Sequence, residues 1–225
     1  MKLLVNLLRD RKIPQLVTNP KSQIAEEFDR IRQNIEFARY EINTKTIIVT
    51  SPGYNEGKST VISNLAMNLS HHGKSVLLID IDIKDPSLNK IFNIKNTVGL
   101  TNVLSGQKPV EEAINQTENA RLKLITTGPV PYDLDSLLQS RKMDELLKRA
   151  SREYDYVLLD SPPVLEGETA KIVAGRCDGA IMVLRVKRTE DEVALEAKKI
   201  LEMTNTKLFG IIMNARKRKF FKKNK

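Results

Sequence analysis

The chain has 225 residues, of which 40% are hydrophobic, and 37 Lys or Arg against 28 Asp or Glu give it a formal net charge of +9. Its length and apolar content suit one compact domain with a sizeable core, and no apolar run is long enough to span a bilayer. Cys177 is the single cysteine, which excludes an intramolecular disulfide, and we expect it to be buried.

Residues 1–20 are predicted to be an arm separate from the main domain, which we place at residues 21–215. Four leucines of the arm fall at helical spacing, at Leu3, Leu4, Leu7 and Leu8. This pattern indicates a short amphipathic helix, which the prolines that follow would end. The apolar stretch is short and is followed by its main positive charges, so we do not expect a signal peptide.

A β-branched strand at residues 47–50 runs into a turn that ends in Gly57-Lys58-Ser59-Thr60 and opens an apolar-periodic helix. Such a turn directs backbone N–H groups and the positive end of the helix dipole at a bound phosphate. We therefore predict a nucleoside triphosphate site, with Lys58 beside the β- and γ-phosphates and the Ser59 hydroxyl on Mg²⁺. The alternative is an ordinary surface loop. The residues predicted to contact the nucleotide are Gly53, Asn55, Glu56, Gly57, Lys58, Ser59 and Thr60.

The spacing of this loop departs from the strict pattern G-x-x-x-x-G-K-[ST]. Pro52 stands where the first glycine belongs, and Gly53 comes one residue late. Proline lacks an amide donor, but the strand before the loop and the helix after it are the context that identifies a phosphate loop. The prediction therefore depends on residues 57–60 and their setting.

Three acids follow two apolar strands at the points where those strands end. Asp80 and Asp82 come after residues 75–79, and Asp160 comes after residues 156–159. In open α/β sheets, ligands bind outside the carboxyl ends of the strands, so we expect the three acids to converge on the phosphate loop and to serve Mg²⁺. For any one acid alone, a strand-end turn or a helix cap is an equal alternative.

Strands alternate with helical patterns along the chain. This alternation predicts an α/β fold with a mostly parallel sheet and helices on both faces. Together with the phosphate loop, it is the organisation of the P-loop NTPases.

The segment after the first acid-bearing strand reads Asp80-Ile81-Asp82-Ile83-Lys84, close to D-x-D-x-R, and residues 155–164 form a Walker B-like segment. With the Walker A-like loop, these motifs resemble the bacterial tyrosine kinases that regulate capsule and exopolysaccharide synthesis, a P-loop family unrelated in fold to eukaryotic protein kinases. The resemblance covers about residues 20–214. The acidic box is the discriminating motif, because it separates this family from most other P-loop ATPases.

The resemblance implies an ATP-dependent protein-tyrosine kinase with Mg²⁺ as its metal. The implied catalytic residues are Lys58, Asp80 and Asp82, with Asp80 as the base or orienter of the tyrosine hydroxyl. The implied metal partners, direct or through water, are Ser59, Asp82 and Asp160. Protein tyrosines are the implied substrates, and the implied activating partner is the cytosolic segment of a membrane adapter, a polysaccharide co-polymerase.

The chain also departs from the family pattern. No tyrosine follows Tyr156, so self-phosphorylation at the C-terminal tyrosine cluster of the family is impossible in this sequence. Asp29 stands at the first arginine of the family's subunit-contact motif E-x-x-R-x-x-R, which leaves a homo-oligomer open. Lys84 replaces a planar arginine with a point charge, and residues 130–138 replace a proline-rich segment.

The last ten residues, 216–225, form a basic tail with seven Lys or Arg and two phenylalanines. Each Lys or Arg near a membrane contributes about 1 kcal/mol of attraction to anionic lipid, so the tail predicts an anionic membrane surface as a partner. A merely solvated terminus is at least as good an explanation, and nucleic acid is a poorer candidate because no recognition module accompanies the tail. We expect a cytoplasmic location, at the inner face of the cell membrane where the tail binds.

Two further functions stay open. One is a non-catalytic regulator that binds nucleotide and adapter, which Asp29 and the missing tyrosines favour and the complete set of acids opposes. The other is a positioning ATPase similar to MinD and ParA, which share the sheet and the acidic strand ends. Those proteins carry an extra lysine where this chain has Gly53, and its absence argues against them.

Overall fold

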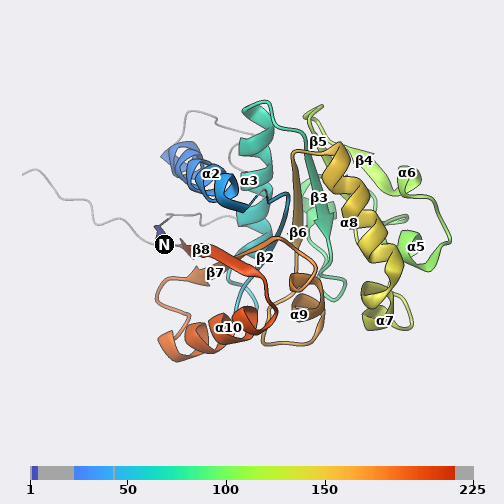
Figure 1. The fold of residues 1–225 in the computed structure, drawn as a ribbon. Coiled ribbons are helices and arrows are strands. Elements are labelled where there is room, and N and C mark those ends of the chain that lie inside the picture. The colour runs from blue at the N-terminus through green and yellow to red at the C-terminus, as the bar shows by residue number, and fades with distance from the viewer. Residues whose placement is uncertain (1, 5–22, 43, 216–225) are drawn as a thin grey trace, which may run out of the picture.

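The computed structural model describes residues 2–4, 23–42 and 44–215. Within these ranges the chain forms one eight-stranded sheet with the strand order β1-β8-β7-β2-β6-β3-β5-β4 (Figure 1). Neighbouring strands are parallel except for β4 and β5, which are antiparallel. The predicted α/β fold with a mostly parallel sheet is confirmed.

The strands are β1 Lys2–Leu4, β2 Thr46–Thr50, β3 Val76–Asp80, β4 Ile114–Gln116, β5 Leu122–Ile125, β6 Tyr156–Asp160, β7 Gly179–Arg185 and β8 Lys207–Asn214. The helices are α2 Gln23–Ile42, α3 Lys58–His71, α4 Leu88–Ile91, α5 Leu100–Ser105, α6 Val110–Ala113, α7 Leu134–Gln139, α8 Arg141–Glu153, α9 Thr169–Ala174 and α10 Asp191–Met203. None of the helices in the described ranges combines the length and the apolar character that crossing a membrane requires.

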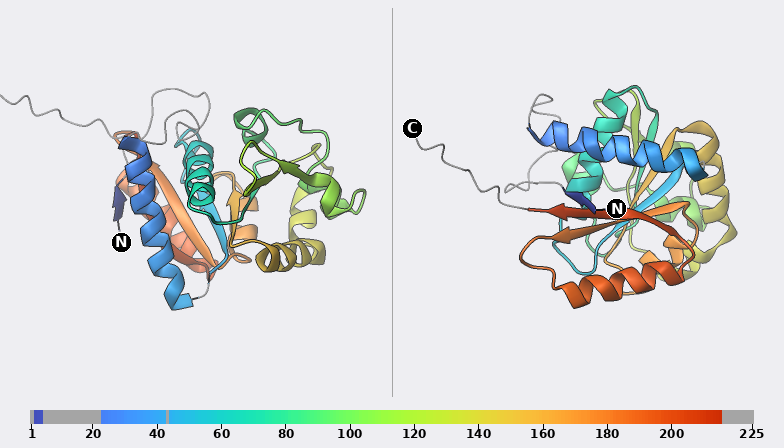
Figure 2. Two further views of the ribbon diagram at one scale, coloured as in Figure 1. Left: turned by 90° about the horizontal axis from the view of Figure 1, so that it is seen from above. Right: turned by 60° about the vertical axis from the view of Figure 1, so that its left-hand side comes forward.

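Helices cover both faces of the sheet, because alternate residues of each strand point into two separate cores. Val49 of the sheet belongs to one buried cluster together with Ile31 of α2 and Leu65 of α3. Its neighbour Ile48 belongs to the opposite cluster, with Leu201 of α10. Figure 2 shows α2, in blue, and α10, in orange-red, on opposite sides of the sheet.

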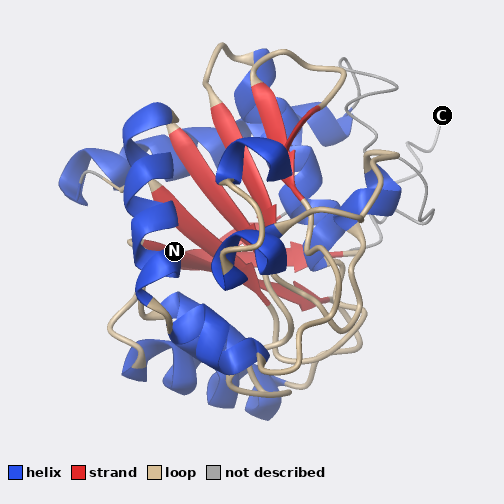
Figure 3. Ribbon diagram, turned by 90° about the vertical axis from the view of Figure 1, so that its right-hand side faces the viewer, coloured by secondary structure: helices blue, strands red, loops and turns tan. Residues whose placement is uncertain are grey.

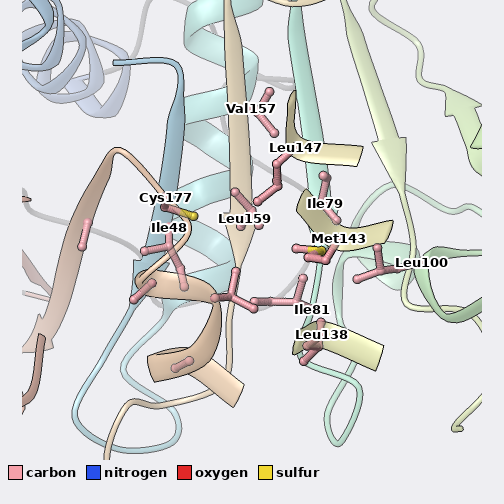
Figure 4. Packing of buried hydrophobic residues seen from close by; sticks show 14 of the residues in the cluster. Ile48, Ile79, Ile81, Leu100, Leu138, Met143, Leu147, Val157, Leu159 and Cys177 are labelled. Atoms are coloured by element: carbon pink, nitrogen blue, oxygen red, sulfur yellow. The ribbon is translucent and has the colours of Figure 1, made fainter. Parts of the chain in front are cut away.

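The second core fills the space between the sheet and α8. In Figure 4, Ile79 and Leu159 of the sheet lie near Met143 and Leu147 of α8. Cys177 belongs to the same cluster, and its burial raises the pKa of the thiol. The prediction that Cys177 is buried is confirmed.

The register of the central strands aligns their carboxyl ends. Asp160 at the end of β6 pairs with Val49 of β2 on one side and with Asp80 of β3 on the other. The loops that leave β2, β3 and β6 therefore emerge at the same end of these strands. Figure 3 shows the twisted sheet, in red, with helices on both of its faces. The carboxyl edge of the sheet positions the candidate site.

One prediction for the N-terminal arm is wrong. Leu3 and Leu4, which were expected on a helix, lie in β1, which pairs in parallel with β8 between Ile211 and Met213. Without β1, β8 would be an edge strand with a row of unpaired N–H and C=O groups. A short extended segment can pair with these groups, and its own backbone groups are then hydrogen-bonded as they would be in a helix. The rest of the arm and the tail at residues 216–225 lie outside the described residues.

Candidate functional site at the carboxyl edge of the sheet

The loop of residues 51–60, called here the phosphate loop, connects β2 to α3. Gly57 precedes the first residue of α3 with a left-handed φ of 93°, and the N–H of Val61 donates to its carbonyl at 3.0 Å. A Cβ at this position would collide with the side-chain amide of Asn214. Glycine is therefore required here for both conformation and space.

The end of β7, which lies beside β2, and the end of β8, the next strand in the sheet, hold the phosphate loop in place. The Glu56 carboxylate accepts hydrogen bonds from the N–H of Arg185 at 2.6 Å and from the Thr189 hydroxyl at 2.7 Å. The amide of Asn214 donates to the Glu56 carbonyl at 2.8 Å, and the Arg185 guanidinium donates to the Asn55 carbonyl at 3.0 Å. We call these contacts the loop latch.

The latch bears on which loop groups face a nucleotide. The Glu56 side chain is directed at the end of β7 and at Thr189, and the Glu56 carbonyl is bonded to Asn214. Of the groups of Glu56, only the backbone N–H is therefore left to contact phosphate. Lys58 is buried, whereas Gly53, Ser59 and Thr60 are partly exposed and the Asn55 side chain is exposed. Sequence reasoning missed Arg185, Thr189 and Asn214, because no motif links positions so far apart in the chain.

The structure brings the three predicted acids together. Asp80, Asp82 and Asp160, called here the acid cluster, are all buried, and Lys58 favours the charged forms of Asp82 and Asp160. The ends of β3 and β6 are also joined through the backbone, since the N–H of Ile81 donates to the Asp160 carbonyl at 2.8 Å. The predicted convergence of the acids on the phosphate loop is therefore present.

Asp80 also organises the turn that follows β3. Its carboxylate accepts hydrogen bonds from the backbone N–H of Asp82 at 3.1 Å, of Leu88 at 3.1 Å and of Ser87 at 3.3 Å. Burial, and next the neighbouring Asp160, nevertheless raise the pKa of Asp80 well above its usual value. The side chain is thus fixed in orientation and poised to hold a proton.

Asp160 is the least satisfied member of the acid cluster. Both of its carboxylate oxygens are buried, and neither has a hydrogen-bond partner among the described residues. Burial raises its pKa to about 7, although the Ser59 side chain and then Lys58 act in the opposite direction. The Ser59 hydroxyl is near enough to favour the charged form, but it lacks hydrogen-bond geometry to either oxygen.

Burial likewise raises the pKa of Asp82, with Lys58 as the main opposing influence. Its carboxylate accepts a hydrogen bond from the N–H of Asp85 at 3.3 Å. A site with three buried acids and one buried lysine has an excess of negative charge when the acids are ionised. A cation would relieve that excess.

These residues fit Mg²⁺. The cation takes oxygen ligands and usually keeps several waters and substrate phosphates, so it needs only one or two carboxylates from the protein. The unpartnered oxygens of Asp160 and the Ser59 hydroxyl would suit this role. Within the described ranges no group of three or more His, Cys, Asp or Glu side chains is arranged to hold a metal by itself. The donor set therefore suits a metal that shares its coordination with phosphate.

A separate surface cavity of about 330 Å³ lies where α5 and α7 meet residues 129–133. Neither the acid cluster nor the phosphate loop lines it. Its position does not make it part of the candidate site.

The helix α2, which carries Asp29, makes contacts within the chain. Asp29 of α2 accepts a hydrogen bond from the Asn68 amide at 2.9 Å and lies 3.3 Å from Nε2 of His72 at the end of α3. An arginine at this position would lose both contacts. Asp29 therefore joins α2 to α3.

Comparison with known proteins gives consistent similarities. A family model described as an AAA domain matches residues 44–187, which include the phosphate loop and the acid cluster. Tyrosine-protein kinase YwqD of Bacillus subtilis (strain 168) is 40% identical over 201 residues, which cover 89% of this chain and 85% of that protein.

Two solved structures extend the comparison. The chimerical protein CapA2B2 matches with a TM-score of 0.90 and 28% identity, covering 95% of this chain and 94% of that chain. The septum site-determining protein MinD from Pyrococcus horikoshii OT3, complexed with Mg-ADP, matches with a TM-score of 0.68 and 25% identity, covering 79% and 72%. The chain is thus more similar in fold and coverage to CapA2B2 than to MinD.

Proposed function

Because the chain belongs to the bacterial tyrosine-protein kinases, we propose that it transfers the γ-phosphoryl group of ATP to the hydroxyl of protein tyrosines. The observation that carries the proposal is the Asp160 carboxylate, buried without a hydrogen-bond partner among the described residues and close enough to Lys58 for the lysine to lower its pKa. A buried acid in that position needs a cation, and the adjoining loop is built to hold phosphate.

Binding of the nucleotide is assigned to the phosphate loop. Residues 53–60 would hold the phosphates through their backbone N–H groups, and Lys58 would neutralise the β- and γ-phosphates. Ser59, Asp82 and Asp160 would hold Mg²⁺, directly or through water; when bound, the metal supplies charge neutralisation on the transferring phosphoryl group. The Mg-ADP complex of MinD supports a nucleotide and Mg²⁺ on this fold.

The proton of the acceptor tyrosine is assigned to Asp80. A phenol with a pKa of about 10 needs a positioned base near neutral pH, and a raised carboxylate pKa brings the base closer to that task. Three backbone N–H groups fix the orientation of the Asp80 carboxylate. Asp80 would accept the proton as the tyrosine oxygen bonds to phosphorus.

The proposal extends to partners and location. We propose that the kinase regulates capsular or exopolysaccharide synthesis. The cytosolic segment of a membrane adapter would activate it. The protein would work in the cytoplasm at the inner face of the cell membrane, with the tail at residues 216–225 binding anionic lipid. Division of the chain into an arm, a kinase domain at residues 21–215 and this tail belongs to the same proposal.

The test is phosphotyrosine formation on a tyrosine-containing copolymer with Mg²⁺ and ATP, with and without the adapter segment. ADP is measured in the same samples. We expect phosphotyrosine and ADP to form in step, and Lys58→Met to lower both at least about 100-fold because charge neutralisation at the phosphates is lost.

The alternatives give different results. ADP without phosphotyrosine would favour a positioning ATPase. Nucleotide binding without either product, in the presence of the adapter segment, would leave a non-catalytic regulator. Either result would contradict the kinase proposal.

A further inference from the structure

The end of β8 lies against the phosphate loop. Asn214, the last residue of this strand, is buried, and its side-chain amide donates to the Glu56 carbonyl at 2.8 Å. The same amide fills the space that a Cβ on Gly57 would occupy. The strand that leads to the tail at residues 216–225 therefore ends in direct contact with the loop that would hold ATP.

Asn214 also fixes the point from which the chain continues. Its side-chain oxygen accepts a hydrogen bond from the N–H of Ala215 at 2.7 Å, and its backbone carbonyl accepts one from the N–H of Val186 at 2.9 Å. Ala215 has a left-handed φ of 59°, a conformation that alanine adopts only at a cost. Hydrogen bonds thus hold this turn in place, and the tail begins beside the phosphate loop.

The surface beside the phosphate loop carries negative charge. Burial, and next three acids, raise the pKa of the Tyr54 hydroxyl on this loop; the acids are Asp82, Glu166 and Asp85. Glu166 and Asp85 are exposed. Bound ATP would add further negative charge, because one Mg²⁺ neutralises only part of the triphosphate. This edge of the sheet therefore attracts cations, and it attracts them more strongly when ATP is bound.

The tail supplies the opposite charge within reach. Its ten residues include seven Lys or Arg and no Asp or Glu. Fully extended, they span at most about 33 to 36 Å. At physiological ionic strength, exposed charges more than about 8 Å apart are largely screened from each other. Because the tail is attached beside the phosphate loop, its cations can come within that distance of the bound phosphates.

We propose that the tail folds back over the carboxyl edge of the sheet and binds the phosphates of ATP held in the phosphate loop. The inference rests on the proposed ATP site and adds a second part of the chain to it. An anionic membrane surface offers phosphate groups to the same cations. Lipid and ATP therefore compete for the tail, and each lowers the affinity of the protein for the other by the same factor.

The test removes three positive charges from the tail and, in a matched control, three from the opposite end of the sheet. The tail variant carries Arg216→Gln, Lys217→Gln and Arg218→Gln. The control carries Arg121→Gln, Lys148→Gln and Arg152→Gln, at exposed positions just before β5 and in the second half of α8. In calorimetric titration with ATP and Mg²⁺ at low ionic strength, we expect the tail variant to bind ATP at least about threefold more weakly than the control, and added salt to reduce the difference.

A second measurement repeats the titration with vesicles. Phosphatidylcholine vesicles that contain phosphatidylglycerol should lower the ATP affinity of the native chain by a similar factor, whereas phosphatidylcholine alone should not. Equal ATP affinities of the two variants, or a native affinity that saturating anionic vesicles leave unchanged, would overturn the inference and leave the ATP site in place. Absence of ATP binding by the native chain would reject the proposed function as well.

Discussion

Of the residues in the acid cluster, Asp160 has the least favourable environment for a charged carboxylate. A buried carboxylate with no hydrogen-bond partner in the described part of the chain is unfavourable when charged, so the metal-free protein holds it protonated over a wide pH range. When it is charged, this residue lowers the stability of the metal-free fold, and under the proposed function bound Mg²⁺ would offset that cost. Its effect should be visible when the metal is absent.

Asp160 predicts a fall in the free energy of unfolding of the metal-free protein as pH rises. Its pKa is about 7 in the folded state against 3.8 ordinarily, so the folded state keeps a proton that the unfolded state releases. Below pH 3.8 both states are protonated, so Asp160 costs the fold nothing. The free energy of unfolding then falls as pH rises from 3.8 through about 7. At 1.36 kcal/mol for each pKa unit, Asp160→Asn should be about 2 to 4 kcal/mol more stable than the native chain at alkaline pH.

The measurement is urea unfolding in a chelating buffer at several pH values on both sides of neutrality. The native chain and Asp160→Asn should converge in stability at acid pH and separate as pH rises. If the two curves run parallel across the whole range, the Asp160 carboxyl does not carry the raised pKa.

The phosphate loop depends on the ends of β7 and β8 as much as on its own sequence. The latch joins Glu56 to Arg185, Thr189 and Asn214, all of which follow it by more than a hundred residues. A turn held at several points keeps its N–H groups directed at the phosphates before ATP arrives. Loss of one contact should therefore affect affinity for ATP.

Asn214→Ala removes the amide that donates to the Glu56 carbonyl. A buried carbonyl without its donor costs about 1 to 3 kcal/mol, and we expect ATP affinity to fall roughly five- to tenfold as the loop loosens. Calorimetric titration with ATP and Mg²⁺ measures the change. Asn34→Ala is the matched control, because its amide donates to the Arg30 carbonyl within α2; equal affinities for the two variants would contradict the latch.

The elements that sequence could predict are those with a local signal. The strand before the phosphate loop and the apolar run before Asp80 both lie where the pattern indicated, since buried parallel strands are apolar throughout. The latch could not be predicted because its partners meet only through the strand order. The helix expected at Leu3 and Leu4 is a strand because tertiary pairing with β8 outweighed a weak local periodicity.

Parallel strands in register place the candidate site at the carboxyl ends of the central strands. The ends of β2, β6 and β3 are level through the pairs of Asp160 with Val49 and with Asp80. That convergence could be predicted, because the carboxyl ends of parallel strands share an edge.

Under the proposed function, this edge of the sheet transfers a phosphoryl group to tyrosine with Asp80 as the base. The direct measurement compares ATP affinity and phosphotyrosine formation on the copolymer for the native chain and Asp80→Asn, with melting temperature as a check on the turn that Asp80 organises. For Asp80→Asn we expect a similar ATP affinity and a transfer rate lower by about 100-fold or more, the usual contribution of a general base. A transfer rate equal to that of the native chain would contradict this role of Asp80.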